Sequence, residues 1–480
     1  MDKAKLIQLL KARFGFDKFR AGQIETLQAV LAGQDTLAIL PTGGGKSLLY
    51  QFPAYLLPGT ILIISPLISL MQDQADRITR QGDFRAVVLN SAVNNQDQAA
   101  ILATLSRYRF IFTSPETLGR GPVLGALRQL SISLFVIDEA HCVSEWGPNF
   151  RPEYLLLKEA IQALQPRSAL LLTATATNRV TNDILKKVGL EEGQVTIIRQ
   201  SVNRANLFLA VQELENPMAK QTYLQAKLPK LGGPGVIYFS SRKQADAMAE
   251  WLRAVTDLRV AAYHAGLEAV ERFRIQNQFM QNELDVICAT SAFGMGIDKN
   301  DLRYVIHYHM PASLAAYAQE IGRAGRDGQP ALALLLYAPG DETIPELLTQ
   351  VELPSQIQMQ EVLTGKKSPA ILGEKGPVIN FYLHHGYQPS ELPALFNHQA
   401  DRARKRISQM LTYVKTQTCR RKLLLAAFDE GEHDQTPCCD FHQPDWQPSD
   451  FGLGKRKQSV EKPAQLNWQE QLNRLFNSHN

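Results

Sequence analysis

The chain has 480 residues, 45% of them hydrophobic and 20% charged, with a formal net charge of +4. This length predicts two or three domains, and the modest charge means that any affinity for nucleic acid must come from local basic patches. No apolar run reaches the ~20 residues of a membrane span. The N-terminal MDKAKLIQLL lacks signal-peptide anatomy, and an odd number of cysteines, five, argues against a disulfide framework. We therefore expect a cytoplasmic protein with no membrane partner.

Short β-branched runs alternate with helical patterns from residue 36 to about residue 200 and again from 236 to 337. Such alternation predicts right-handed βαβ units and parallel sheets covered on both faces. We expect two tandem α/β domains, at 1–205 and 206–341, joined by a connecting stretch near 201–230. The predicted strands are 36–40, 61–65, 86–90, 110–114, 134–139, 170–175, 195–199, 236–240, 260–264, 286–290, 304–308 and 333–337.

The pattern beyond residue 341 is different. Residues 342–400 are predicted to be a mostly helical connecting region. A basic run follows, and it is either a candidate contact for duplex DNA or a solvated helix face. Residues 446–480 form a predicted tail, in which LNWQEQLNRLF (466–476) has the spacing of a packing helix. The basic residues of the run are Arg402, Arg404, Lys405, Arg406, Lys415, Arg420, Arg421 and Lys422.

The stretch PTGGGKS, residues 41–47, separates the first predicted strand from an apolar, helix-like segment. Consecutive glycines let several backbone N–H groups point at one spot, and a following helix adds the positive end of its dipole. We expect Lys46 to reach the β- and γ-phosphates of a nucleotide and the Ser47 hydroxyl to ligate Mg²⁺. Leu40 replaces the first glycine of the usual pattern, so a glycine-rich turn is the alternative. The candidate phosphate-binding residues are Thr42, Gly43, Gly44, Gly45, Lys46 and Ser47.

The strand at 134–139 ends in two carboxylates, at the sheet edge where open α/β sheets bind ligands. Asp138 is predicted to hold Mg²⁺ and Glu139 to polarise the attacking water. His141 lies just beyond, where it would sense the γ-phosphate. The alternative is an acidic strand end that caps a helix.

The second α/β domain contains QEIGRAGRDG, residues 319–328. Arg323 and Arg326 are three residues apart and share one face of a helix or turn. Because phosphoryl transfer uses an arginine from outside the phosphate loop, we expect these two to complete the site; a solvated basic turn is the alternative. If ATP binds between the two domains, its hydrolysis would open and close the cleft and so move a bound polymer.

In this order the motifs resemble those of RecQ-family DNA helicases of superfamily two, over residues 8–340 and again over 401–442. FGFDKFRAGQ (14–23) resembles the adenine-binding motif, and SPLISLMQDQ, TATAT, YFSSRK, YHAGL and ATSAFGMGIDK follow. The resemblance implies two RecA-like domains, ATP and Mg²⁺ as cofactors, and 3′→5′ movement on single-stranded DNA and on tailed or forked duplexes. It further implies a monomer in the bacterial nucleoid, serving DNA repair or recombination with single-strand-binding or recombination proteins as possible partners. The nucleotide contacts that it implies are Phe16, Arg20, Gln23, Gln319 and Asp298, and the DNA contacts are Ser65, Pro66, Ser240, Arg242 and His264.

The segment most specific to this family is SEWGPNFRPEY, residues 144–154. Trp146, Phe150 and Arg151 suit stacking on unpaired bases, worth ~1–3 kcal/mol per base; the alternative is that the two aromatic residues anchor the core. Glu145, with Pro148 and Asn149, departs from the family pattern of Gln, His and Asp. We therefore predict weaker coupling between DNA binding and ATP hydrolysis than is typical.

The resemblance also implies a structural zinc site in a helical hairpin at 401–445. Cys419, Cys438, Cys439 and His442 are the candidate ligands, and three thiolates with one imidazole make a plausible tetrahedral shell. Because adjacent cysteines would need a strained backbone, His433 is an alternative to one of them. Cys142 and Cys288 are predicted to be packing residues.

The short sequence after His442 implies a short form that lacks the winged-helix and C-terminal helical domains of longer relatives, and hence weak unwinding. Two other functions stay open at this stage. One is an RNA helicase, since the DEAH residues are shared with RNA enzymes. The other is a DNA-binding scaffold that hydrolyses ATP only to release DNA.

Overall fold

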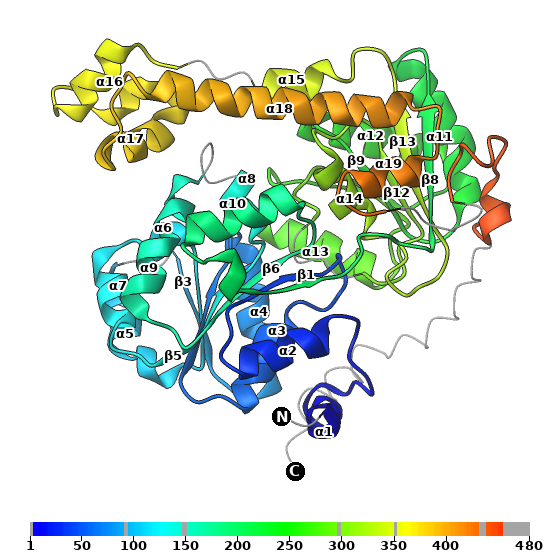
Figure 1. Ribbon diagram of the computed structural model, residues 1–480. Helices are drawn as coiled ribbons and strands as arrows, with labels where there is room; N and C mark the ends of the chain where they lie inside the picture. Colours follow the sequence, from blue (N-terminus) through cyan, green and yellow to red (C-terminus); the bar gives the residue numbers. More distant parts are fainter. Residues whose placement is uncertain are drawn as a thin grey trace, which may run out of the picture.

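The computed structural model describes residues 3–90, 95–145, 151–294, 299–349, 353–431 and 438–454. Within them lie two parallel sheets, each built from a continuous part of the chain, as the sequence predicts (Figure 1). The first has seven strands in the order β3-β4-β2-β5-β6-β1-β7. Its strands are β1 (Thr36–Ile39), β2 (Thr60–Ile64), β3 (Ala86–Leu89), β4 (Phe110–Thr113), β5 (Ile132–Ile137), β6 (Ala169–Thr173) and β7 (Thr196–Arg199).

The second sheet has six strands in the order β10-β11-β9-β12-β13-β8. Strands such as β2 (TILII) and β13 (ALALLLY) are buried along their whole length, because helices cover both faces of each sheet and leave no side for polar residues. The strands of the second sheet are β8 (Leu207–Glu213), β9 (Gly235–Tyr238), β10 (Val260–Tyr263), β11 (Val286–Ala289), β12 (Tyr304–His307) and β13 (Ala331–Tyr337).

Helices on the first sheet enclose two apolar cores, one on each face. They are α1 (Lys3–Phe14), α2 (Gln23–Leu31), α3 (Leu48–Gln51), α4 (Ile68–Gln81), α5 (Asn95–Ala103), α6 (Pro115–Leu118), α7 (Gly121–Leu127), α8 (His141–Glu145), α9 (Leu157–Leu164) and α10 (Asn178–Val188), with 3₁₀ turns η1 (Phe52–Tyr55), η2 (Leu105–Arg107), η3 (Pro152–Leu156) and η4 (Glu192–Gln194). The second sheet likewise has a core on each face, covered in part by α11 (Pro217–Leu231), α12 (Arg242–Val255), α13 (Ala269–Met280) and α14 (Leu314–Ile321).

Two details of the predicted order are wrong. The stretch near 201–230 is not only a connection, because it contains β8, which pairs along its full length with β13 at one edge of the second sheet, and most of α11. The helix predicted after the phosphate loop is only the four-residue α3, because Pro53 in η1 cannot continue it.

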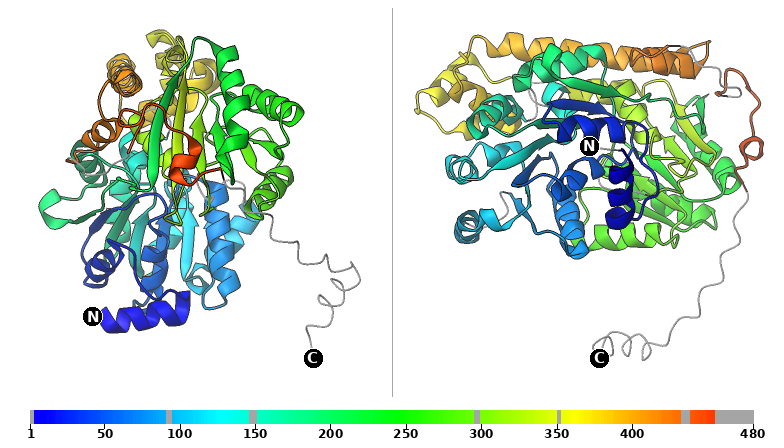
Figure 2. Two further views of the ribbon diagram at one scale, coloured as in Figure 1. Left: turned by 90° about the vertical axis from the view of Figure 1, so that its right-hand side faces the viewer. Right: turned by 60° about the horizontal axis from the view of Figure 1, so that its bottom comes forward.

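The helical prediction for 342–400 is confirmed in the described residues. Met359 and Ile379, among others, form a separate apolar core, and we call the segment 353–396 the helical lobe. The long α18 leaves this lobe and runs along one side of the molecule to the second sheet, as the two views in Figure 2 show. The helices of this region are α15 (Thr343–Thr349), α16 (Gln356–Leu363), α17 (Gly376–His384), α18 (Leu392–Lys415) and α19 (Arg420–Ala426), with 3₁₀ turns η5 (Pro369–Lys375) and η6 (Pro448–Phe451).

The basic run lies on α18 and α19, but it is not one exposed patch. Arg420 and Arg421 are buried; Arg420 Nε donates to Asp440 Oδ1 at 2.5 Å. Lys415 forms an exposed ion pair with Glu213 at 2.5 Å. Interpreting the whole run as a DNA contact is therefore wrong for the two arginines of α19, which serve the interior.

Several predicted residues lie outside the described ranges: Trp146, Phe150, Asp298, His433 and the helix predicted at 466–476. Among the helices that the structure describes, none is both long and apolar enough to cross a bilayer.

Candidate active site and metal centre

The phosphate loop, residues 41–47, connects the end of β1 to α3 at the carboxyl edge of the first sheet. Gly43 and Gly45 have φ angles of +82° and +74°, in the left-handed region that glycine tolerates. A Cβ on Gly45 would lie 2.5 Å from Nε2 of Gln23. Glycine is therefore required by backbone conformation and by a close approach at the same place.

Gln23 and Arg20 support this loop from the N-terminal segment. Gln23 is buried, and its amide nitrogen donates to Gly44 O at 3.0 Å and to Gly45 O at 3.1 Å. Arg20 donates to the carbonyl of Gly43. Phe16 is 55% exposed, which leaves its ring free to stack on a flat ligand. The three residues predicted to bind adenine thus lie in a segment that contacts the phosphate loop directly.

The two carboxylates lie as predicted, directly after β5. Lys46 Nζ is 3.8 Å from Glu139 Oε1, and His141 Nδ1 is 3.3 Å from Glu139 Oε2. Burial and the charge of Glu139 raise the pKa of Asp138 to about 6. Burial alone would also raise the pKa of Glu139, but Lys46 and His141 lower it to about 2.

Two adjacent acids beside one lysine, Asp138 half-buried and Glu139 buried, suit a nucleotide bound with a divalent cation. The Glu139 Oε2 atom is contacted by His141 Nδ1, so the carboxylate is oriented from one side by His141 and from the other by Lys46. Mg²⁺ that arrives with ATP would neutralise phosphate charge. With that nucleotide bound, Lys46 would hold the phosphates, Asp138 and Ser47 would offer oxygen ligands to the cation, and Glu139 would orient a water.

The second domain places residues 322–326, which we call the arginine loop, against the phosphate loop. A Cβ on Gly43 would lie 3.1 Å from both Cγ and Cδ of Arg326, and a Cβ on Gly322 would lie 3.3 Å from Cβ of Thr42. Arg323 is buried, bonds to the carbonyl of Gly294, and contributes to the low pKa of Glu139. Gln319 lies one turn earlier, in α14.

Predicted DNA contacts of the first domain gather near the start of α4. Arg151 donates to the carbonyl of Pro66 and lies 3.4 Å from Glu116 through Nε. Ser65 is 2% exposed, and its hydroxyl has no hydrogen-bond partner in the described residues. Arg151 thus ties the segment after Trp146 and Phe150 to the Ser65–Pro66 segment rather than extending freely.

The predicted DNA contacts of the second domain follow β9 and β10. Arg242 and Ser240 are exposed. His264 is buried: its Nε2 is 2.8 Å from Asp246 Oδ1, and Nδ1 accepts from Gly266 N at 3.2 Å. Both ring nitrogens are engaged within the chain, so His264 orders its loop and leaves contact with a ligand to its exposed neighbours.

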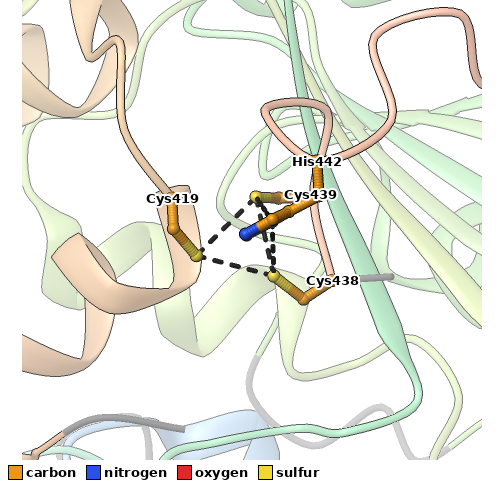
Figure 3. A group of neighbouring side chains, drawn as sticks. All are labelled: Cys419, Cys438, Cys439 and His442. Atoms are coloured by element: carbon orange, nitrogen blue, oxygen red, sulfur yellow. Dashed lines mark hydrogen bonds between the residues drawn. The ribbon is translucent and has the colours of Figure 1, made fainter. Parts of the chain in front are cut away.

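Four candidate zinc ligands converge between α19 and the segment at 438–442 (Figure 3). The Sγ of Cys438 is 3.5 Å from that of Cys419 and 3.6 Å from that of Cys439. His442 Nδ1 is 3.3 Å from the Sγ of Cys438 and 3.4 Å from that of Cys439. Tetrahedral zinc with Zn–S bonds of about 2.3 Å separates sulfurs by about 3.8 Å, so the four atoms fit one ion.

Sequence reasoning missed some residues of the site. Thr173, at the end of β6, places its hydroxyl 3.2 Å from His141 Nδ1; the motif TATAT was the available signal. Arg204, between the two sheets, donates to three carbonyls of the arginine loop. A single arginine in a connecting segment gives no motif by which it could be found.

Comparisons with known proteins agree with this geometry. Three family models match in succession: DEAD/DEAH box helicase over residues 20–184, helicase conserved C-terminal domain over 219–328, and RecQ zinc-binding over 391–443. The chain is 38% identical to the probable ATP-dependent DNA helicase RecS of Bacillus subtilis, with 98% of each chain covered. It is 36% identical to the ATP-dependent DNA helicase RecQ of Haemophilus influenzae, covering 92% of this chain and 64% of that protein.

Among solved structures, the DEAD-box helicase Mss116 bound to single-stranded RNA is similar in fold, with a TM-score of 0.59 at 17% identity over 88% of this chain and 90% of that one. The two RecA-like sheets, the phosphate loop and the arginine loop define an ATP-dependent helicase motor. The chain belongs to the RecQ family of ATP-dependent DNA helicases. Its cofactors are ATP with Mg²⁺ and structural Zn²⁺, and the nucleic acid that it acts on is DNA.

Proposed function

We propose that this helicase translocates 3′→5′ along single-stranded DNA and unwinds duplexes ahead of it, in DNA repair or recombination. The packing of Arg326 against Gly43 carries the proposal, since it brings the cation of one domain to the phosphate loop of the other. The resemblance to RecQ helicases supplies the polarity. We further propose that the protein acts as a monomer on chromosomal DNA in the cytoplasm, alongside single-strand-binding or recombination proteins.

In this proposal each wall of the cleft has its own task. Lys46 holds the β- and γ-phosphates, and Glu139 orients the attacking water. Arg323 and Arg326 stabilise the charge that develops on the transferred phosphoryl group. When the γ-phosphate leaves, the attraction between the two walls falls, and the arginine loop separates from the phosphate loop.

Opening of the cleft would move the two DNA-contacting surfaces apart. The first would lie at the exposed start of α4, because Ser65 and Pro66, the predicted DNA contacts, are themselves buried beside it; the second contains Ser240 and Arg242. The segment containing Trp146, Phe150 and Arg151 would stack on bases, and Arg151 links it to Pro66. Alternating grip by the two surfaces turns each ATP cycle into a step along the strand.

A strand-displacement assay tests this function. We expect the protein to displace the strand of a 3′-tailed duplex with ATP and Mg²⁺, and to leave a 5′-tailed duplex intact. Lys46→Ala should abolish both ATP hydrolysis and displacement while DNA binding stays. ATP hydrolysis without displacement would indicate the scaffold function instead, and equal stimulation by DNA and RNA of the same sequence would contradict a DNA-specific motor.

A further inference from the structure

Arg204 lies in the segment that joins the two sheets, and its guanidinium grips the arginine loop. Nη1 donates to Gly322 O at 2.9 Å, and Nη2 donates to Ala324 O at 3.1 Å and to Gly325 O at 2.7 Å. Three carbonyls converge on one side chain because the backbone turns at Gly325, where φ is +60°. The carbonyls flank Arg323 in the chain, so their position fixes where that side chain begins.

Arg421, in α19, holds the backbone around Arg204 in turn. It is 2% exposed. Its Nη1 donates to Arg204 O at 2.8 Å and to Asn203 Oδ1 at 2.7 Å. Its Nη2 donates to the carbonyl of Leu207 and, at 3.3 Å, to that of Cys438. A rigid planar fork of five donors thus joins the zinc-binding segment to the connection between the domains.

The turn that follows α19 adds two anchors. Glu430 Oε1 accepts from Val202 N at 2.8 Å. Asp429 Oδ2 accepts from Asn178 N at 2.6 Å, at the start of α10 in the first domain. The short helix α19 and the turn after it therefore contact the connecting segment and the first domain together, and the helix starts directly after the zinc ligand Cys419.

These hydrogen bonds could simply satisfy buried carbonyls, but the charges around Arg204 favour a further role. Burial lowers the pKa of Arg204; the nearby charge of Arg326 lowers it further, Asp327 raises it, and Arg20 lowers it. Guanidinium groups close enough to lower one another's pKa are stabilised by anions near them, and Asp327 is one such anion. The triphosphate predicted for this cleft would be a second.

We propose that Arg204 and Arg421 are positioning residues for ATP hydrolysis, through which the zinc-bound end of the chain sets where Arg323 and Arg326 lie in the cleft. The inference rests on the proposed function, in which those two arginines act on the transferred phosphoryl group. Zinc then stabilises more than its own hairpin, because α19 transmits its position to the arginine loop.

The test uses full-length, zinc-loaded protein. For Arg204→Ala we expect kcat of the DNA-stimulated ATPase to fall about tenfold to a hundredfold, as for a catalytic group displaced by about 1 Å. The KM for ATP, the Kd for single-stranded DNA, zinc content and Tm should stay close to wild type. Arg204→Lys should recover only part of kcat, because one ammonium group cannot reach three carbonyls.

Arg259→Ala is the matched control. Arg259 also donates to a carbonyl and pairs with a carboxylate, those of Asn282 and Asp285, in the same domain. It makes no contact with the arginine loop among the described residues, so its kcat should stay unchanged. Arg421→Lys should lower kcat while zinc stays bound. If this buried variant fails to fold, the kcat values of Arg204→Ala and Arg204→Lys test the inference instead.

A double mutant tests the positioning role of Arg204 separately from the proposed function of Arg323 and Arg326. Arg204→Ala combined with Arg326→Ala should lose less kcat than the product of the two single losses, because part of the effect of Arg204→Ala is exerted through Arg326 and the rest through Arg323. Fully additive losses, or a fall in kcat matched by a fall in Tm and zinc content, would overturn the positioning role. Full activity of Arg326→Ala would contradict the proposed function of the two arginines. Full activity of Arg204→Ala, with activity lost in Arg326→Ala, would contradict only the positioning role of Arg204.

Discussion

Cys438 and Cys439 are consecutive residues that face the same cluster. Leu209 N donates to Cys438 O, and Asp440 N donates to Leu209 O at 3.0 Å, so this segment pairs briefly with β8. Neighbouring side chains of an extended strand point to opposite faces. Here the chain turns at once, through His442 N donating to Cys439 O at 3.0 Å. Neither cysteine has a positive φ, so the turn achieves the convergence without left-handed strain.

Metal content tests this arrangement at the level of single residues. We expect Cys438→Ser and Cys439→Ser each to reduce zinc from about one ion per chain to a small fraction, because a tetrahedral site tolerates the loss of a thiolate poorly. Thermal unfolding should begin at a lower temperature. Cys288→Ala, in the buried strand β11, is the control and should keep its zinc. Full zinc in Cys439→Ser would show that a different residue completes the shell.

Helix α18 connects the helical lobe to the core of the second domain. Its 24 residues extend about 36 Å, with Phe396 packed in the helical lobe and Met410 in the core of the second domain. Arg406, midway along it, lies 3.7 Å from Glu145 of the first domain. Glu145 is one of the departures from the family pattern, so the exchanged residue has a partner on the long helix.

The helical lobe contacts the first domain through Leu155, which packs against its core. Leu155→Asp should release the lobe, because an unpaired carboxylate is costly to bury. We expect faster hydrogen exchange of the amides in α16 and α17, measured by mass spectrometry. Ile357→Asp is the matched control, since Ile357 lies in the lobe and is 73% exposed. Equal exchange in the two variants would mean that Leu155 does not hold the lobe.

At the scale of the whole molecule, the two sheets meet where the phosphate loop faces the arginine loop. The net charge of +4 cannot by itself attract a strand, so affinity for DNA must come from individual phosphate contacts. We expect the association constant for a single-stranded oligonucleotide to fall roughly tenfold or more between about 50 and about 200 mM salt, because each contact releases counterions.

A pair of variants assigns part of that salt dependence to one residue. Arg242→Gln should make the slope of log K against log salt shallower by about 0.7, the value of one contact with a single strand. Arg259→Gln removes an arginine of the same domain that is paired with Asp285 and should leave the slope unchanged. If both variants keep the wild-type slope, Arg242 does not touch a phosphate.

The two sheets and most of the nucleotide site can be predicted from the sequence, because the residues that define them form short local patterns. Continuous apolar strands predict the two parallel sheets, and PTGGGKS and the Asp138–Glu139 pair each depend on neighbours within a few residues. The carboxyl ends of parallel strands share an edge, which is why these motifs meet. The predicted strands differ from the observed ones mainly at their ends, and β8 was missed because it is an edge strand in a segment that reads as a connection.

Contacts between residues far apart in the sequence had to come from the folded chain. Arg421 bonds to the backbone of Arg204, more than two hundred residues earlier, and both look like ordinary members of basic or connecting segments when read in order. A buried arginine donates hydrogen bonds to several backbone carbonyls, whereas an exposed one is solvated. Whether it is buried depends on which distant elements pack together. Contacts of this kind connect the zinc cluster, the long helix and the arginine loop. No short sequence pattern predicts them, because the residues that make them are far apart in the chain.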